Sequence, residues 1–259
     1  IFRIVLGAIS CCTLYLAWRT PPSKDAASIR ANPNHTIMKI LVTGGLGFIG
    51  SHTVVELQNK GFEVLIVDNL YNSSIDVLKG IESISGIAPH YKNIDLRDKA
   101  SVQALFKEYS DIAGVIHFAA SKAVGESVEN PLLYYENNIA ALVYLLQELQ
   151  QKDAASFIFS SSCTVYGQAE KMPITEDAPV QQPMSPYGNT KKVGEEIIRD
   201  TAKASSINAI LLRYFNPIGA HPTAEIGELP IGVPQNLVPF ITQTAIGLRQ
   251  ELSVFGDDY

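Results

Sequence analysis

The chain has 259 residues, 46% of them hydrophobic, and a formal net charge of −6 at pH 7. This length suits one large α/β domain, or one domain with part of a second. The negative charge and the scattered lysines and arginines argue against a surface that binds nucleic acid. The three cysteines, Cys11, Cys12 and Cys163, form neither a disulfide framework nor a metal-ligand spacing. We therefore expect no metal site, and either a reducing compartment or indifference to redox conditions.

The first 37 residues differ from the rest of the chain. Residues 4–18 form an apolar run of 15 residues between Arg3 and Arg19. This run is shorter than the roughly 18 to 25 residues of a membrane span, although it suits the core of a signal peptide. Because the first methionine, Met38, directly precedes a strand pattern, we expect residues 1–37 to be extraneous and the native protein to begin there. The alternative is an amino-terminal membrane anchor on a lumenal enzyme.

From residue 38 onward, short β-branched runs alternate with longer helical patterns. The runs predict strands at residues 39–43, 63–67, 114–118, 156–159 and 209–213, with a further strand ending at residues 93–96. The helical patterns cover residues 49–60, 75–85, 101–109, 134–151 and 187–204. Continuously apolar strands separated by helices predict an α/β fold with a parallel sheet covered on both faces. After Phe215 the alternation fails and glycine and proline become frequent, which predicts a smaller, looser lobe.

The segment TGGLGFIG, residues 43–50, lies between the first strand and the first helix. Gly44 permits a tight turn, Gly47 lets the backbone approach a pyrophosphate, and Gly50 allows close packing of the helix. The helix N-terminus then offers N–H groups to phosphates. Asp68 ends the second strand 18 residues after Gly50, close to the spacing of an acid that binds ribose hydroxyls. An acid there repels a 2′-phosphate and favours NAD over NADP; the alternative is an ordinary turn followed by a helix-capping aspartate.

Two further segments fall where a dinucleotide-binding fold would use them. Asp95 follows the third strand, near where an adenine amino group would lie, although it could equally cap the next helix. The segment HFAASK, residues 117–122, follows the fourth strand, and its alanines would let the chain run close to a cofactor. Lys122 could equally be a solvated loop charge.

Tyr187 and Lys191 are four residues apart, so a helix places them on one face. A tyrosine has a pKa near ~10, and a cation about 4 to 6 Å away lowers it by roughly 1 to 3 units, which makes the phenol a better base. Ser162, 25 residues before Tyr187, lies in a serine-rich segment at the edge where α/β sheets bind ligands. Its hydroxyl could hold a substrate oxygen while Tyr187 exchanges a proton and Lys191 supplies charge. Taken singly, these patterns also occur on solvated helices and ordinary loops.

Together these motifs resemble the extended short-chain dehydrogenase/reductase superfamily and, within it, the UDP-glucose 4-epimerase family. The resemblance runs from Met38 to Tyr259, and its most specific segments are LVTGGLGFIGSHT, HFAASKAVGES, FSSSCTVYG, SPYGNTK and LRYFNPIGAHP. It implies a doubly wound parallel sheet, the Rossmann fold, with an NAD-binding domain at residues 38–214. Residues 215–259 would begin a smaller substrate-binding lobe.

The resemblance also implies the site residues. Those that would contact NAD, beside the glycine loop and the Tyr187 and Lys191 pair, are Phe48, Ile49, Asp68, Asn69, Asn72, Ser73, Asp95, Leu96, Phe118, Ala119, Ala120, Lys122, Asn137 and Phe215. Those that would line the nucleotide-sugar pocket are Ser162, Tyr187, Asn216, Asn236, Leu237, Ser253, Val254 and Phe255.

The activity implied is NAD-dependent interconversion of UDP-glucose and UDP-galactose, an isomerisation of galactose metabolism. Tyr187 would remove the proton of the sugar 4-hydroxyl while C4 is oxidised. The 4-keto sugar would then rotate in the site and be reduced again on its other face. A 4,6-dehydratase would need carboxylates where this chain has Cys163 and Thr164. Epimerisation of UDP-arabinose, UDP-xylose or a UDP-N-acetylhexosamine stays open. A non-catalytic NAD-binding protein would be expected to lack the serine, tyrosine or lysine.

Three expectations concern the whole protein. The family continues beyond the equivalent of Tyr259, so we expect this chain to keep the NAD fold but to bind UDP-sugars poorly. The helices at residues 101–109 and 134–151 would form the interface of a homodimer, although their apolar faces could equally pack on the sheet. The protein is expected in the cytoplasm, unless residues 4–18 anchor it to a membrane.

Overall fold

The computed structural model describes residues 38–169, 171–254 and 256, and the backbone alone of residues 14–19. Most of the amino-terminal extension expected at residues 1–37 therefore lies outside the described residues, as does Phe255. The strands are β1 (Leu14–Arg19), β2 (Lys39–Thr43), β3 (Glu63–Asp68), β4 (His90–Asn93), β5 (Ile112–His117), β6 (Ser156–Ser162) and β7 (Asn208–Tyr214). The helices are α2 (Phe48–Asn59), α3 (Val77–Ser85), α4 (Lys99–Glu108), α5 (Val124–Glu129), α6 (Pro131–Tyr135), α7 (Ala141–Leu149), α8 (Pro186–Ala204) and α9 (Leu237–Ala245).

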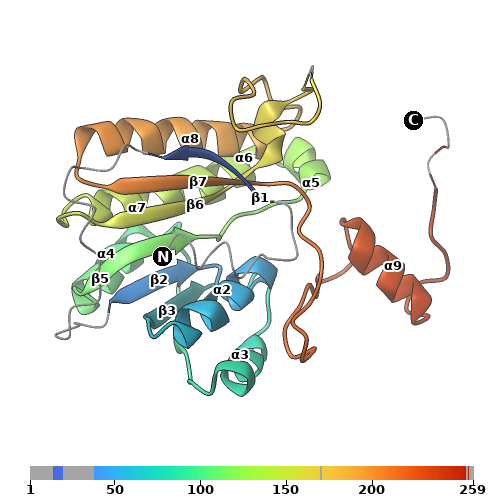
Figure 1. Cartoon of the computed structure of the whole chain (residues 1–259), viewed down its shortest axis with the longest axis horizontal. Coiled ribbons are helices and arrows are strands. Elements are labelled where there is room, and N and C mark those ends of the chain that lie inside the picture. Colours follow the sequence, from blue (N-terminus) through green and yellow to red (C-terminus); the bar gives the residue numbers. More distant parts are fainter. Residues whose placement is uncertain (1–13, 20–37, 170, 255, 257–259) are drawn as a thin grey trace.

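The strands form one sheet in the order β1-β7-β6-β5-β2-β3-β4. Neighbouring strands from β4 to β7 run parallel, and β1 pairs antiparallel with β7 at the edge. The chain winds outward from β2 in one direction and then from β5 in the other, so the order reverses between these two central strands (Figure 1). This arrangement confirms the predicted doubly wound parallel sheet, in which ligands bind at the reversal point.

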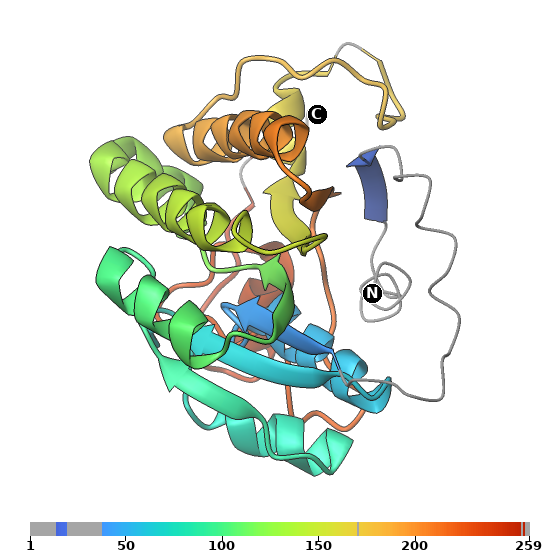
Figure 2. The ribbon, with the colours of Figure 1, turned by 90° about the vertical axis from the view of Figure 1, so that its left-hand side faces the viewer.

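The sheet is covered on both faces because its strand residues alternate between two hydrophobic layers. Leu41 packs in one layer with residues of α4, α7 and α8, whereas Ile40 and Val42 pack in the other with residues of α2 and α3. Figure 2 shows α4 and α7 on one side of the sheet and α2 on the other. Side chains of successive strand residues point to opposite faces, so burial on both faces requires the continuously apolar strands seen in the sequence.

Several elements differ from the sequence expectation, which included neither β1 nor α5. The helix expected at residues 134–151 is a composite of α6, the π-helical turn η2 (Glu136–Ala140) and α7. A π-helical turn has no hydrophobic period of its own that a sequence pattern would reveal. The region after Phe215, expected to be loose, contains the regular helix α9.

The helix α8 begins where local chemistry favours a start. The Ser185 hydroxyl accepts a hydrogen bond of 3.1 Å from the Gly188 N–H, and Pro186 occupies the first turn, where no backbone N–H is needed. This cap sets the helical register of Tyr187 and Lys191.

Candidate functional site

A cavity of about 410 Å³ lies at the carboxyl ends of the central strands. The loops after β2, β3, β4, β5, β6 and β7 all contribute to its lining. Every residue expected to contact NAD lines this cavity, including those of the glycine loop. Ser162, Tyr187, Asn216 and Asn236, expected in the nucleotide-sugar pocket, line it too. Residues from positions 44 to 236 of the chain thus meet at one edge of the sheet.

The structure does not bring the last expected substrate residues to the cavity. Leu237 and Val254 are 68% and 79% exposed, and Ser253 is also exposed. None of these three lines the cavity, because α9 and the segment after it lead away from the sheet (Figure 1). Their expected place in the sugar pocket is not seen in this structure, and Phe255 lies outside the described residues.

The glycine loop packs too tightly for side chains at two positions. Gly44 has φ +66°, and a Cβ there would lie 2.7 Å from the Ala119 backbone nitrogen. A Cβ on Gly50 would lie 2.2 Å from the Gly44 carbonyl oxygen. The tight turn brings the N-terminus of α2 to the cavity wall, where its N–H groups can receive a phosphate.

Asp68 is buried beside this loop, at the end of β3. Its carboxylate accepts hydrogen bonds from the Leu46 N–H at 3.1 Å, the Leu70 N–H at 3.0 Å and the Ser73 hydroxyl at 2.8 Å. These bonds fix a negative charge next to the glycine loop. The arrangement fits a ribose diol and disfavours a further phosphate by like-charge repulsion.

The proposed reactive side chains gather at the end of β6. Ser162 is the last residue of β6, and its hydroxyl accepts a hydrogen bond of 3.2 Å from the Thr164 N–H at the start of the short 3₁₀ turn η3 (Cys163–Tyr166). Lys191 is buried, and its Nζ lies 5.8 Å from the centre of the Tyr187 ring. The same ammonium donates a hydrogen bond of 2.8 Å to the Ser160 carbonyl oxygen.

The pKa values in this group correct one expectation. Burial raises the pKa of Tyr187, and a hydrogen bond with Ser162 opposes that rise. The expected lowering of the Tyr187 pKa by Lys191 is not seen in this structure, where desolvation is the main cause of the shift and Lys191 is not among its causes. Burial also lowers the pKa of Lys191 itself, to about 8, so its positive charge is costly where it stands.

Two residues at the cavity wall carry buried hydroxyl groups without partners among the described residues. Within the part of the chain that the structure describes, the hydroxyl oxygens of Thr164 and Tyr214 are buried with no hydrogen-bond partner. Both residues line the cavity. Buried hydroxyls are nearly always hydrogen-bonded, so these two are exceptions close to the cavity wall.

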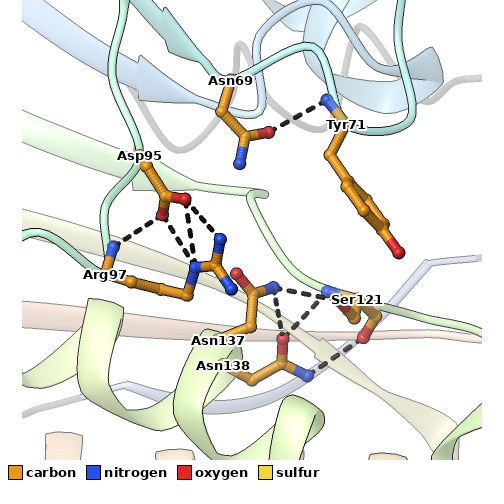
Figure 3. A network of polar contacts seen from close by, with 7 residues as sticks. All are labelled: Asn69, Tyr71, Asp95, Arg97, Ser121, Asn137 and Asn138. Atoms are coloured by element: carbon orange, nitrogen blue, oxygen red, sulfur yellow. Dashed lines mark hydrogen bonds and ion pairs between the residues drawn. The ribbon is translucent and has the colours of Figure 1, made fainter.

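The structure shows polar side chains in or beside the cavity wall that sequence patterns did not reveal, and of these Arg97 and Glu228 line the cavity. Figure 3 shows Arg97 hydrogen-bonded to the Asp95 carboxylate. It also shows the side-chain amide of Asn138, in η2, hydrogen-bonded to the backbone of Ser121 in the loop after β5. Glu228 accepts a hydrogen bond from the Asn236 amide at 2.5 Å and lies 3.5 Å from Lys122. Arg97 follows Asp95 by two residues, a spacing that could have suggested an ion pair, whereas no local pattern marks Asn138 or Glu228.

The described residues offer neither a side-chain cluster that could bind a metal ion nor a helix that could span a membrane. They contain no group of three or more histidine, cysteine or carboxylate side chains placed to hold a metal ion. Among them, no helix combines the length and the apolar character that crossing a bilayer requires.

Comparisons with known proteins agree with this geometry. The UDP-glucose 4-epimerase of Haemophilus influenzae is 52% identical over 223 residues, which are 86% of this chain and 66% of that protein. A structure of UDP-glucose 4-epimerase from Bifidobacterium longum in complex with NAD+ and UDP matches with a TM-score of 0.82 at 46% identity, over 86% of this chain and 66% of that one. The enzyme from Stenotrophomonas maltophila, with bound NAD and formylated UDP-arabinopyranose, matches with a TM-score of 0.80 at 48% identity and the same coverage.

The chain spans slightly less than two thirds of the Haemophilus protein, 66% of its length, and a smaller share of longer relatives such as the bifunctional protein of Pachysolen tannophilus, 32% of which is covered. Residues 40–257 match the family model described as the NAD dependent epimerase/dehydratase family. With a match over most of the chain, a doubly wound sheet and a glycine loop at the cavity, the chain belongs to the NAD dependent epimerase/dehydratase family.

Proposed function

We propose that this chain forms the NAD-binding part, and the beginning of the substrate-binding part, of an enzyme that interconverts UDP-glucose and UDP-galactose. Residues 38–214 are the NAD-binding domain in this proposal, and residues 215–259 begin the substrate lobe. The observation that carries it is the meeting of Ser162, Tyr187 and Lys191 in the same cavity as the glycine loop and Asp68.

NAD is held in this proposal by three parts of the chain. The N–H groups at the start of α2 receive the pyrophosphate, Asp68 receives a ribose, and Asp95 receives the adenine amino group. When bound there, NAD would supply the hydride acceptor and donor for the carbon at sugar position 4. Gly44 and Gly50 allow the close backbone packing that brings these N–H groups to the cavity wall.

The reactive side chains move and hold a proton at the sugar 4-oxygen. Ser162 donates a hydrogen bond to that oxygen, and the Tyr187 hydroxyl exchanges the proton with it. Because burial raises the pKa of Tyr187, the phenol keeps its proton in this structure and can take the sugar proton only once that pKa is lowered. Its service as a base requires further positive charge nearby, which lowers a phenol pKa.

A different UDP-sugar is the second candidate. The structure of the Stenotrophomonas enzyme contains bound formylated UDP-arabinopyranose, so a protein similar to this chain binds a UDP-sugar other than UDP-glucose or UDP-galactose. A 4,6-dehydratase is disfavoured because Cys163 and Thr164, which line the cavity after Ser162, provide no carboxylate for the elimination of water.

The proposal extends to the protein's surroundings. We propose a homodimer that associates through α4 and through the composite helix of α6, η2 and α7. We also propose a cytoplasmic location. Sedimentation of the purified protein would test the first and fractionation of cells the second.

The decisive assay incubates the protein with NAD and UDP-galactose and measures the UDP-glucose formed. Conversion without consumption of NAD supports the proposal, because the cycle leaves no net redox change. Parallel incubations with UDP-arabinose and UDP-N-acetylglucosamine separate the candidate sugars. No conversion of any UDP-sugar by a full-length, NAD-loaded protein that contains this chain would contradict the epimerase proposal.

A further inference from the structure

We propose that Arg97 is a positioning residue that fixes the Asp95 carboxylate so that it accepts a hydrogen bond from the amino group of adenine. The inference rests on the proposed NAD site and extends it to a side chain at the rim of the cavity. Asp95 and Arg97 both line the cavity, in the loop that follows β4.

The Arg97 guanidinium and the Asp95 carboxylate form a bidentate ion pair, called the fork below. Arg97 Nε lies 3.0 Å from Asp95 Oδ1 and 3.1 Å from Oδ2, and Arg97 Nη2 lies 2.6 Å from Oδ2. The Arg97 backbone N–H also donates to Oδ1 at 2.9 Å (Figure 3). A planar guanidinium paired in this way sets the orientation of a carboxylate as well as its position.

The location of the pair explains why the carboxylate needs such a fork. β4 is the edge strand of the sheet, and it ends at Asn93, before Asp95. The side chains of Asp95 and Arg97 are 36% and 39% exposed, so neither is packed in the core. A partly exposed carboxylate would otherwise rotate freely, and ordering it would weaken ligand binding.

The fork contributes little to the stability of the fold. Ion pairs with this exposure stabilise a protein only slightly, because water screens the charges and long side chains lose entropy. Its geometric effect is confined to the cavity rim, where Asn69 lies on the other side of the carboxylate (Figure 3). The conformation of Asp95 is therefore constrained from both sides at the place where a base would bind.

The chemistry of the fixed group defines what it recognises. Arg97 and Asn69 both hold the pKa of Asp95 below its ordinary value, so the carboxylate is ionised. An ionised carboxylate only accepts hydrogen bonds. It therefore favours a purine with an amino group at position 6, such as adenine, and rejects one with an oxygen there, such as hypoxanthine.

The experiment measures binding by calorimetry with NAD and with nicotinamide hypoxanthine dinucleotide. The variants are Arg97→Gln, Arg97→Lys and the control Lys203→Gln, which removes an exposed ion pair with Asp200 on α8, outside the cavity lining. Wild type should prefer NAD. Arg97→Gln should weaken NAD binding roughly three- to tenfold and reduce that preference, because the carboxylate is no longer oriented. Arg97→Lys keeps the charge without the fork and should restore little of the preference.

The outcomes separate this inference from the proposed function. If wild type binds neither dinucleotide, the proposed NAD site is wrong and this inference falls with it. If wild type prefers NAD and Arg97→Gln keeps both the affinity and the preference, the role of Arg97 is refuted while the NAD site stands. An equal loss for both dinucleotides, or full rescue by lysine, would show an effect of charge alone and would also refute positioning. Thermal melting of each variant verifies that the fold is intact.

Discussion

Lys191 Nζ lies 5.8 Å from the centre of the Tyr187 ring and donates a hydrogen bond of 2.8 Å to the Ser160 carbonyl oxygen. The lysine therefore ties α8 to the end of β6, two residues before Ser162. It holds α8, which carries Tyr187, against β6, which carries Ser162.

Replacement of Tyr187 by phenylalanine should reduce the conversion of UDP-galactose by about 10² to 10⁴-fold, because the proton at the sugar 4-oxygen loses its carrier. NAD binding should persist, since the ring remains. The measurement is the rate of UDP-glucose formation beside a calorimetric titration with NAD. Tyr144→Phe, on α7 outside the cavity lining, is the matched control. Conversion by Tyr187→Phe at the rate of wild type would remove Tyr187 from the mechanism.

The buried charge of Lys191 should make stability depend on pH. Its pKa is about 8 in the folded chain against an ordinary value of 10.5, so between these values only the unfolded chain binds the proton. The free energy of unfolding should therefore rise with pH across this window, by about 3 kcal/mol for this group. Lys191→Met lacks that contribution.

Urea unfolding of both proteins at intervals from pH 7 to 10.5 tests this dependence. The difference between them isolates Lys191, because the other titrating groups are common to both. Wild type should gain stability relative to Lys191→Met as pH rises above about 8. Parallel curves would mean that the folded-state pKa of Lys191 is close to its ordinary value.

Removal of Glu195 should destabilise the fold strongly. Glu195 and Arg213 are almost fully buried, and their side chains pair at 2.7 and 2.8 Å, while the Ser161 hydroxyl donates to Glu195 at 2.6 Å. Glu195→Ala leaves the Arg213 charge buried without its partner, which costs about 3 to 5 kcal/mol. The neighbouring exposed Glu196→Ala should change the free energy of unfolding by less than about 0.5 kcal/mol. Equal losses in the two variants would contradict this account of the buried pair.

Gly50→Ala should distort the glycine loop. The added Cβ would lie 2.2 Å from the Gly44 carbonyl oxygen, so the loop must shift, at a cost of about 1 to 3 kcal/mol and with loss of NAD affinity. Gly125→Ala is the control. Gly125 lies in the helix α5, and a Cβ added there would meet no atom within 4 Å. That change should be neutral or stabilise the fold by up to about 1 kcal/mol. Chemical denaturation and NAD titration of both variants give the comparison.

Local patterns in the sequence were sufficient to predict the parallel sheet, the glycine loop and the placement of Tyr187 and Lys191 on one helix face. Each depends on residues close in sequence: apolar runs that must be buried on both faces, glycines at a turn, and a spacing of one helical turn. The strand order confirmed the sheet, and the cavity brought the expected NAD residues together.

Such local patterns could not predict loop conformations or interactions between segments far apart in the chain. The fork of Arg97 on Asp95 depends on a loop conformation, the contact of Glu228 with Lys122 joins residues far apart in the chain, and the π-helical turn before α7 breaks the helical period. The sign of the Tyr187 pKa shift was likewise misjudged from spacing. Spacing specifies which charge is near, whereas the degree of burial, which only the packed chain sets, decides whether attraction or desolvation dominates.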